Sequence, residues 1–569
     1  MSDIQGFGRR FTAVSAALTF ILPVCAPAIE FDGGIVNGNV DTTVSFGAIS
    51  RVQGRDSSIV CIANGGTAYG CNADDGNLNY DTGMVSQVWK AISDIEVNHE
   101  SGNMGAFFRV KAFMDTRNNS RTETKRTDLS KKAKQLVGED VDVLDAYGWF
   151  RFNMADRPAE VRLGKHTLNW GESSFISGGI NAINPMDFSA LRAPGMELRE
   201  ALLPVTMVSG SVDPTNNLSV EGFYQLEWDQ MMFEPTGSYF NTFDNETALH
   251  MGWGFTAENA MSVPRGADNS PDDSGQWGVA MRYFAEGMNS TEFGLYFMNY
   301  HSRTPVISGT ASAGTPMAPI PPKNYFLEYP EDIQLFGASF NTNLGLWALQ
   351  GEYSYKHDLP LQIDDAEFLV AGLGPVNAPN QVGTFGANDY VRGYILRDVS
   401  QLQATATRIF SDVMWAHQFV FVAEVGLTHV HGMPDKDDLR LEGSGTFASG
   451  NPLHRNLGKL SSPITESSDH FPDATSWGYQ LIGEWTYANA FMGANLSPHA
   501  AFRHDVGGVS PVGWTGNFIE GSKAATVGVT ATYKQAWAAD ISYTSFFGGG
   551  RYNLLNDRDY VAFNLKYSF

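Results

Sequence analysis

The chain of 569 residues is long for one ordinary globular domain, yet no linker or shift in composition divides it. Its formal net charge of −24 excludes non-specific binding to nucleic acid, which needs a basic surface to displace counterions from phosphate. With 12% aromatic and only 18% charged residues, it also lacks the composition of a disordered protein.

Residues 1–28 have the pattern of a secretory signal peptide. Two arginines precede an apolar run over residues 11–24, and a small-x-small motif ends at Ala28. We predict cleavage after Ala28, which leaves residues 29–569 as a single mature domain. No later segment approaches about eighteen uninterrupted apolar residues, so the sequence offers no transmembrane helix.

The mature chain keeps two cysteines, Cys61 and Cys71. In an exported protein an isolated close pair favours a disulfide bond. We predict that this bond closes one loop. Two free thiols are the less favoured alternative in an oxidising compartment.

Residues 116–143 are irregular and basic. At the outer rim of a membrane protein such a loop would bind the phosphates of lipopolysaccharide, but a solvated charged loop explains the same composition, and both interpretations stay open. The basic residues are Arg117, Arg121, Lys125, Arg126, Lys131, Lys132 and Lys134.

Residues 169–204 do not alternate between polar and apolar positions. The segment holds a Gly178-Gly179 pair, prolines at positions 185 and 194, and many apolar side chains. Exposed to water, that much apolar surface would favour aggregation. We predict that the segment folds inward as a constriction or plug.

Seven residues of this segment are our candidate ligand or gate residues. We expect apolar contacts from two aromatic side chains, polar anchoring from a glutamate and two asparagines, and a short helical turn capped by an aspartate. The functional interpretation is a gate or binding surface for an amphipathic solute, and the alternative is a structural wedge. The candidates are Trp170, Glu172, Phe175, Asn181, Asn184, Asp187 and Arg192.

Polar and apolar residues alternate over 218–229, 418–428, 477–487 and 525–533. A period of two places the apolar side chains on one face of a strand. Many such segments reach the roughly nine to eleven residues that a tilted membrane-spanning strand needs. The charged residues then face the interior, where they suit a wet lumen or pair with one another; they are Glu221, Arg282, Glu352, Lys356, Glu424, Glu484, Arg503 and Asp540.

Residues 429–438 contain two histidines and three aspartates, but their spacing matches neither an EF-hand nor a zinc motif. The sequence also has no GxSxG elbow, HExxH pair or Walker loop. We therefore expect no enzymatic activity, no cofactor and no metal site.

The clearest strand is the last one. Phe563, Leu565, Tyr567 and Phe569 share one face, and small or polar residues lie between them. A terminal aromatic residue with this alternation resembles the C-terminal signal that the outer-membrane barrel assembly machinery reads. We expect that machinery as a partner and the outer membrane of a Gram-negative bacterium as the location.

Short turns, predicted at residues 101–103, 213–217 and 341–343, alternate with connections of roughly ten to fifty residues. Short periplasmic turns and long external loops are the asymmetry of an outer-membrane barrel. The sequence thus predicts an all-β, antiparallel transmembrane barrel of about eighteen strands. Fourteen or sixteen strands are alternatives, because boundaries from sequence are uncertain by several residues.

Three stretches carry a family resemblance: LGKHTLNWGESSFISGGINAINPMDFSALRAPGMELREALLPVTM at 163–207, EYSYKHDLPLQ at 352–362 and ISYTSFFGGGRYNLLNDRDYVAFNLKYSF at 541–569. With them the chain resembles, from about Ile35 to its C-terminus, the bacterial family known as domain of unknown function 1302.

The resemblance implies a Gram-negative outer-membrane barrel that passes or binds small hydrophobic molecules such as lipids, sterols or aromatic compounds. It implies outer-membrane lipids and lipopolysaccharide as surroundings, and a periplasmic lipid-carrier protein and a resistance-nodulation-division transporter as partners. It brings no catalytic residues. Two alternatives remain: a general polar porin, and a structural or docking component of a trans-envelope lipid transport assembly.

Overall fold

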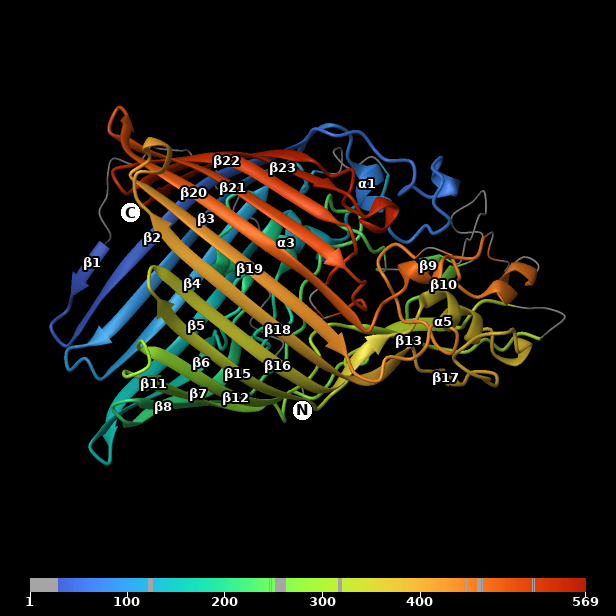
Figure 1. Ribbon diagram of the computed structural model, residues 1–569, viewed down its shortest axis with the longest axis horizontal. Coiled ribbons are helices and arrows are strands. Elements are labelled where there is room, and N and C mark those ends of the chain that lie inside the picture. The colour runs from blue at the N-terminus through green and yellow to red at the C-terminus, as the bar shows by residue number, and fades with distance from the viewer. Residues whose placement is uncertain are drawn as a thin grey trace.

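The computed structural model describes residues 29–120, 126–244, 246, 248–250, 262–315, 320–446, 448–457, 462, 464–513, 515 and 517–569. The predicted signal peptide, and Arg121 and Lys125 of the basic segment, lie outside the described residues. The described part of the chain consists mainly of long strands and the loops between them (Figure 1).

One antiparallel sheet holds 19 strands, and eighteen of them close into a ring. β1 (Ile29–Asp32) pairs only with the start of β2 (Val36–Arg51). The rest of β2 pairs with the last strand, β24 (Tyr560–Ser568), which closes the barrel. The predicted closed barrel and its strand number are thereby confirmed.

Between β2 and β24, the barrel strands follow one another in chain order, each hydrogen-bonded to the next. They are β3 (Gly83–His99), β4 (Met104–Asp115), β5 (Glu139–Met154), β6 (Arg157–His166), β7 (Val205–Thr215), β8 (Leu218–Gln225), β11 (Trp277–Ala285), β12 (Thr291–Tyr300), β15 (Ile333–Leu344), β16 (Trp347–Gln362), β18 (Tyr394–Phe410), β19 (Gln418–Val430), β20 (Thr475–Phe491), β21 (Ala494–Gly507), β22 (Lys523–Tyr533) and β23 (Trp537–Phe547).

The remaining described elements are short and lie in the connections. They are the strands β9 (Ala248–His250), β10 (Ser262–Pro264), β13 (Val306–Thr310), β14 (Asn324–Glu328) and β17 (Tyr390–Val391), the helices α1 (Asp75–Asn79), α2 (Lys131–Val137), α3 (Phe188–Arg192), α4 (Leu198–Ala201) and α5 (Asp365–Ala371), and the 3₁₀ helices η1 (Ile62–Asn64), η3 (Gly374–Val376), η4 (Val413–Trp415), η5 (Pro452–Asn456), η7 (Ser468–His470) and η8 (Gly550–Tyr552).

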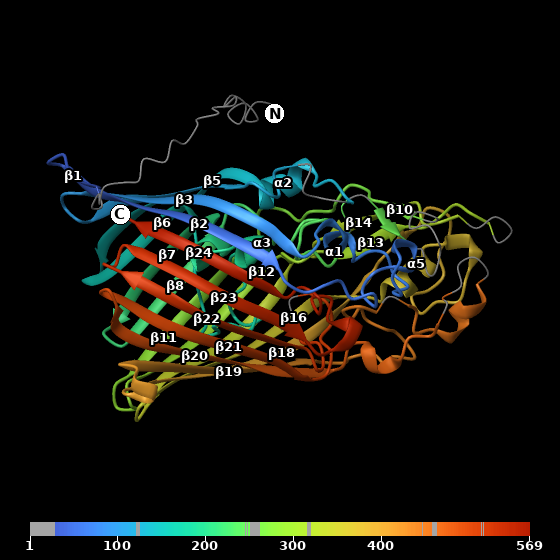
Figure 2. The ribbon, with the colours of Figure 1, turned by 90° about the horizontal axis from the view of Figure 1, so that it is seen from above.

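Short turns gather at one end of the barrel and long loops at the other (Figures 1 and 2). The turn at 101–103 is confirmed, whereas β7 runs on to Thr215 and leaves a shorter turn than predicted. The turn predicted at 341–343 is wrong, because these residues belong to β15. The hairpin turns instead at Gly345, whose φ of 63° suits the positive φ that tight hairpins need.

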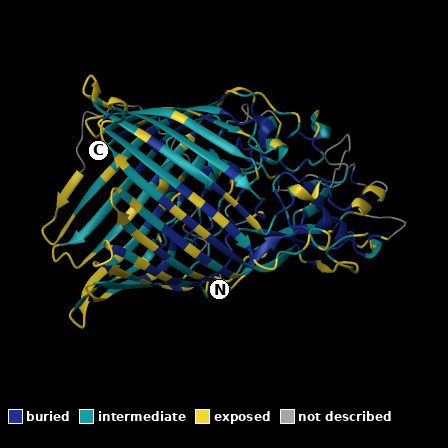
Figure 3. Ribbon diagram, in the orientation of Figure 1, coloured by how far each residue is buried: buried dark blue, intermediate teal, exposed yellow. Residues whose placement is uncertain are grey.

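Exposed and less exposed residues alternate along the barrel strands (Figure 3). Ile541, Leu402 and Val527 point outward and are more than half exposed, at 51%, 55% and 56%. Inward-facing Glu352 and Glu424 are 3% and 1% exposed. An apolar outer face on a ring without edges fits hydrocarbon, because every strand satisfies its backbone on its two neighbours.

Among the residues that the structure describes, no helix has the length and apolar character needed to cross a bilayer.

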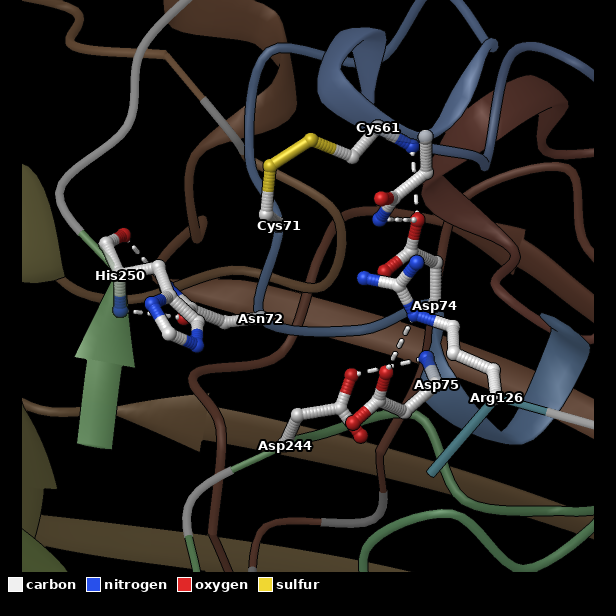
Figure 4. Close-up of a disulfide and its surroundings, with 9 residues drawn as sticks. Cys61, Cys71, Asn72, Asp74, Asp75, Arg126, Asp244 and His250 are labelled. Carbon is white, nitrogen blue, oxygen red and sulfur yellow. Dashed lines mark hydrogen bonds and ion pairs between the residues drawn. A yellow bond between two sulfur atoms is a disulfide. The ribbon is translucent and has the colours of Figure 1, made fainter. Parts of the chain in front are cut away.

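A disulfide bond staples the long loop between β2 and β3. It joins Cys61 to Cys71, whose Cα atoms lie 5.0 Å apart (Figure 4). The Cys61 N–H donates to the carboxylate of Asp74 at 2.9 Å, and this bond connects the disulfide to the start of α1. The predicted bond and its position in a loop are confirmed.

Candidate functional site

The connection between β6 and β7, residues 167–204, does not continue the barrel wall. Figures 1 and 2 both place its helix α3 inside the outline of the barrel. Many of its apolar side chains are buried: Trp170 and Ile183 are each 1% exposed and Ile180 is 0% exposed. They form one core with inward-facing strand residues that include Phe223 and Leu335. The predicted inward fold of this segment, which we call the inward segment, is observed.

A glutamate of β16 holds the first bend of the inward segment. The carboxylate of Glu352 accepts hydrogen bonds from the backbone N–H groups of Glu172, Ser173 and Ile180, at 2.6, 3.0 and 2.9 Å. A Cβ atom on Gly179 would lie only 1.8 Å from the same carboxylate. This explains why glycine is needed at a position where the backbone passes so close to Glu352.

A second glutamate, on β19, holds the tip of the segment. Glu424 accepts from the consecutive N–H groups of Ser174, Phe175 and Ile176, at 3.2, 3.0 and 2.8 Å. The hydroxyl of Thr405 donates to it as well, at 3.2 Å. Successive backbone N–H groups form a concave anion-binding surface, and here the anion is a side chain of the wall.

Ion pairs tie the second half of the segment to β3 and β24. Lys90 pairs with Glu200 at 2.5 Å, and Lys566 pairs with Glu197 at 2.6 Å. The two glutamates form a capping box at the start of α4. The inward segment is therefore joined to β6 and β7 at its two ends. Side chains of β16, β19, β3 and β24 hold it between these ends.

The seven predicted site residues all lie on the inward segment, and two of them are deeply buried in it. The indole N–H of Trp170 donates to Glu221 at 2.7 Å, and its ring lies 5.1 Å from that of Phe223. The amide oxygen of Asn184 accepts from the Leu168 N–H at 2.9 Å. Both side chains fix the shape of the segment.

Two more of the predicted residues belong to α3. Asp187 caps the helix by accepting from the Ala190 N–H at 2.9 Å, so the predicted capped turn is observed. Arg192, in the last turn, pairs with Glu234 of the loop after β8 at 3.0 Å. The helix thus joins the inward segment to an external loop.

The remaining three predicted residues differ in exposure. Phe175 is 45% exposed. The amide oxygen of Asn181 is buried and has no hydrogen-bond partner among the described residues. Glu172 is partly exposed and accepts from the side chain of Asn341 at 3.2 Å.

A cavity of about 80 Å³ lies between the second half of the segment and the inner face of β2 to β4. Ile49, Val88, Phe113 and Pro194 supply apolar walls. Lys111 also lines it; this side chain is 7% exposed, and its ammonium forms no ion pair with any described residue.

The inner face of β20 to β23 is polar. Its inward positions include Glu484, His499, Arg503, Thr530 and Asp540, and adjacent strands bring them side by side. Among the described residues, no hydrogen bond or ion pair joins these side chains to the inward segment. This side of the lumen is therefore charged, and the charged side chains named here are not bonded to the inward segment.

The sequence identified the residues of the inward segment but not the side chains that hold it. Glu352, Lys356 and Glu424 were expected to face the lumen, either in water or paired with other inward charges. Lys90 and Lys566 were not singled out, since a lone lysine in a strand carries no signal beyond its charge. Lys356 donates to the Gly178 carbonyl.

The family model described as "Protein of unknown function (DUF1302)" matches residues 9–569. No curated protein matches the chain in sequence.

Among solved structures, a BenF-like porin from Pseudomonas fluorescens Pf-5 aligns over 94% of this chain and 98% of its own, with 10% identity and a TM-score of 0.41. OccK1 (OpdK) from Pseudomonas aeruginosa aligns over 94% and 98%, with 9% identity and a TM-score of 0.41. OccAB3 from Acinetobacter baumannii aligns over 94% and 99%, with 10% identity and a TM-score of 0.41. The barrel described above rests on the strand pairing of this chain itself.

Proposed function

Because this chain belongs to the DUF1302 family, whose description names no activity, we propose a function from its own structure. It is an outer-membrane channel that passes small, mainly hydrophobic molecules through a lumen narrowed by the inward segment. The observation that carries this proposal is the way two wall glutamates, Glu352 and Glu424, hold that segment inside the ring.

The width of the barrel supports a passage. A barrel of roughly eight strands can be filled by its own side chains, whereas barrels of about sixteen to eighteen strands leave an aqueous channel. This ring has eighteen strands, and the 38-residue connection 167–204 enters it from the wall. A solute that crosses the barrel must therefore move past or displace the inward segment.

The lining near α3 supports a solute with an apolar body. The cavity there has apolar walls from Ile49, Val88, Phe113 and Pro194, and charged side chains that include Lys111, Asp115 and Glu200 also line it. Apolar walls with a few polar groups in between are typical of small-molecule sites. Such a lining suits part of a lipid, sterol or aromatic compound whose apolar body also carries a polar group.

The predicted export signal and the shape of the barrel support a location in the cell. The predicted signal peptide directs export, and a barrel with short turns at one end and long loops at the other suits the outer membrane of a Gram-negative cell. We place the short turns and both chain ends in the periplasm and the disulfide-bonded loop outside, where oxidising conditions maintain the bond.

The polar inner face of β20 to β23 favours one alternative, a general polar porin. Purified protein in liposomes distinguishes the two through the uptake of octanoate and of glucose. A channel for hydrophobic molecules admits octanoate faster, whereas a polar porin shows a large steady conductance and no such preference. Absence of any permeation would indicate a docking component instead.

Deletion of residues 178–193 tests the role of the inward segment. The deletion removes α3 and the part of the segment beside the cavity. We expect a higher single-channel conductance in planar bilayers and a weaker preference for octanoate. Unchanged conductance and uptake, in a barrel shown by circular dichroism and heat-modifiable migration to be assembled, would contradict the proposed gate.

A further inference from the structure

Three carboxylates from two external loops meet above the barrel wall. Asp364 and Asp365 lie at the start of α5, in the loop that follows β16, and Glu442 lies in the loop that follows β19. One oxygen of each lies within 4.8 Å of the others. The Asp364 N–H donates to the Arg440 carbonyl at 3.0 Å, so backbone contacts hold the two loops together at this point.

Asp364 is the centre of this cluster. Its side chain is 0% exposed, and neither carboxylate oxygen accepts a hydrogen bond of good geometry from a described residue; the Ala366 N–H offsets its charge only in part. Glu442 differs, because its oxygens accept from the Asp365 N–H at 2.8 Å and from Thr446 at 3.2 Å. A buried carboxylate without a well-placed donor and with two anionic neighbours is strongly unfavourable unless it takes up a proton or a positive charge compensates it.

The nearby protein cation is engaged elsewhere. Arg440 lies 3.8 Å from Glu367 and 3.6 Å from Asp437. It forms no ion pair with Asp364, Asp365 or Glu442 in the described part of the chain.

Burial, followed by repulsion from Asp365 and Glu367, raises the pKa of Asp364 well above its usual value. Burial raises the pKa of Asp365 to about 6. Burial and the charges of Asp365 and Asp364 raise the pKa of Glu442. Without a cation, each of the three carboxyl groups therefore favours its protonated form more than an exposed one does.

A second acidic cluster provides a contrast. Asp74, Asp75 and Asp244 also approach one another, beside the disulfide bond (Figure 4). There Arg126 lies 3.0 Å from Asp75, and the Asp74 carboxylate accepts from the Asn64 side chain at 2.9 Å. This cluster already contains a cation.

We propose that Asp364, Asp365 and Glu442 bind a calcium ion that links the two external loops. Calcium takes six to eight oxygen ligands, with carboxylates in one- or two-oxygen contacts and flexible geometry, whereas magnesium demands a near-ideal octahedron and retains its water. Carboxylates that arise from separate loops, with both oxygens of Asp364 free, suit the less demanding ion. Calcium sites that face the exterior typically have dissociation constants of about 10⁻⁴ to 10⁻³ M.

Full-length mature protein, folded in detergent and treated with EDTA, is titrated with CaCl₂ by isothermal titration calorimetry. The variants are Asp364→Asn and Glu442→Gln, and the control is Asp438→Asn, which removes the same charge from an exposed position of the second loop. We expect the two site variants to bind one calcium ion fewer than the wild type, and the control to bind the same number.

Stability without calcium separates a metal site from a merely structural contact. In EDTA, Asp364→Asn should protect the two loops from proteolysis at least as well as the wild type does, because it removes a buried charge. With calcium the order should reverse. Equal calcium stoichiometry in wild type and both site variants, or equal binding of magnesium, would overturn the proposal.

Discussion

Single carboxylates in this barrel differ chiefly in what compensates their charge. Glu424 has three backbone N–H groups and a threonine hydroxyl around it, whereas Asp364 accepts no hydrogen bond of good geometry from a described residue. A hydrogen bond to a charged group contributes about 1.5–3 kcal/mol. Glu424 therefore stabilises the inward segment strongly without a cation.

Replacement of Glu424 by glutamine should loosen the tip of the inward segment. Glutamine has one acceptor oxygen in place of two and no charge, so the three N–H groups lose part of their partner. We expect larger and more frequent current fluctuations in planar-bilayer recordings.

Glu484→Gln is the matched control. It removes the same charge from the inner face of the adjacent strand, where no hydrogen bond reaches the inward segment from this side chain in the described part of the chain. Both variants should alter ion selectivity alike through the lost charge. Equal current fluctuations in Glu424→Gln and Glu484→Gln would show that Glu424 acts on permeating ions and not on the inward segment.

The inward orientation of Glu352 and Glu424 was predictable from the strand period, but their partners were not. They contact residues 180 and 250 positions earlier in the chain. No local pattern reports a contact between one loop and the far wall. The same limit hid the cluster of Asp364 and Glu442, which separate loops bring together.

At the scale of elements, the contact between the two loops that carry Asp364, Asp365 and Glu442 should change in stability with pH. The direction of this change should be opposite to that of an ordinary salt bridge. The folded-state pKa values of Asp364, Asp365 and Glu442 lie above those of the unfolded chain, which are about 4. The folded loops thus bind more protons than the unfolded ones. Without calcium, the stability of their contact should fall as pH rises from about 4 through 6 and above.

Hydrogen exchange of residues 363–371 and 439–446, corrected for the intrinsic rate, measures this effect. In EDTA we expect weaker protection at pH 7.5 than at pH 5, and calcium should restore protection at the higher pH. Asp364→Asn should show a smaller dependence on pH. Protection that increases with pH in EDTA would contradict the assigned shifts.

Turn positions were harder to predict than strands. Asn341 and Asn343 look like turn residues, yet they continue β15, paired with Gln350 and Ala348 of β16. The backbone turns where a residue without a side chain accepts a positive φ, at Gly345. Alternation over many residues identifies a strand reliably, whereas two or three residues of turn character do not identify its end.

For the whole molecule, the last residue extends the pairing between β2 and β24 that closes the barrel. The Phe569 N–H donates to the Thr42 carbonyl at 2.9 Å, and the Thr42 N–H donates to the Phe569 carbonyl at 2.7 Å. Deletion of Phe569 removes this pair and the terminal aromatic residue of the predicted assembly signal. We expect a several-fold lower yield of heat-modifiable, membrane-embedded protein.

Ile541→Ala is the control for this deletion. Ile541 pairs with Phe563 across the β23–β24 contact and faces outward, but it belongs to neither the terminus nor the closing pair. The control should assemble normally. Normal assembly of the protein that lacks Phe569 would show that neither the closing pair nor the terminal residue is needed.

The anchors of the inward segment impose an order on biogenesis. The segment is synthesised after β3, which supplies Lys90, but before the strands that supply Glu352, Glu424 and Lys566. A wall that stops before β24 lacks the Lys566 anchor, so the segment gains its full set of anchors only when the first and last strands pair. We therefore expect an unclosed barrel to leak more than the complete ring.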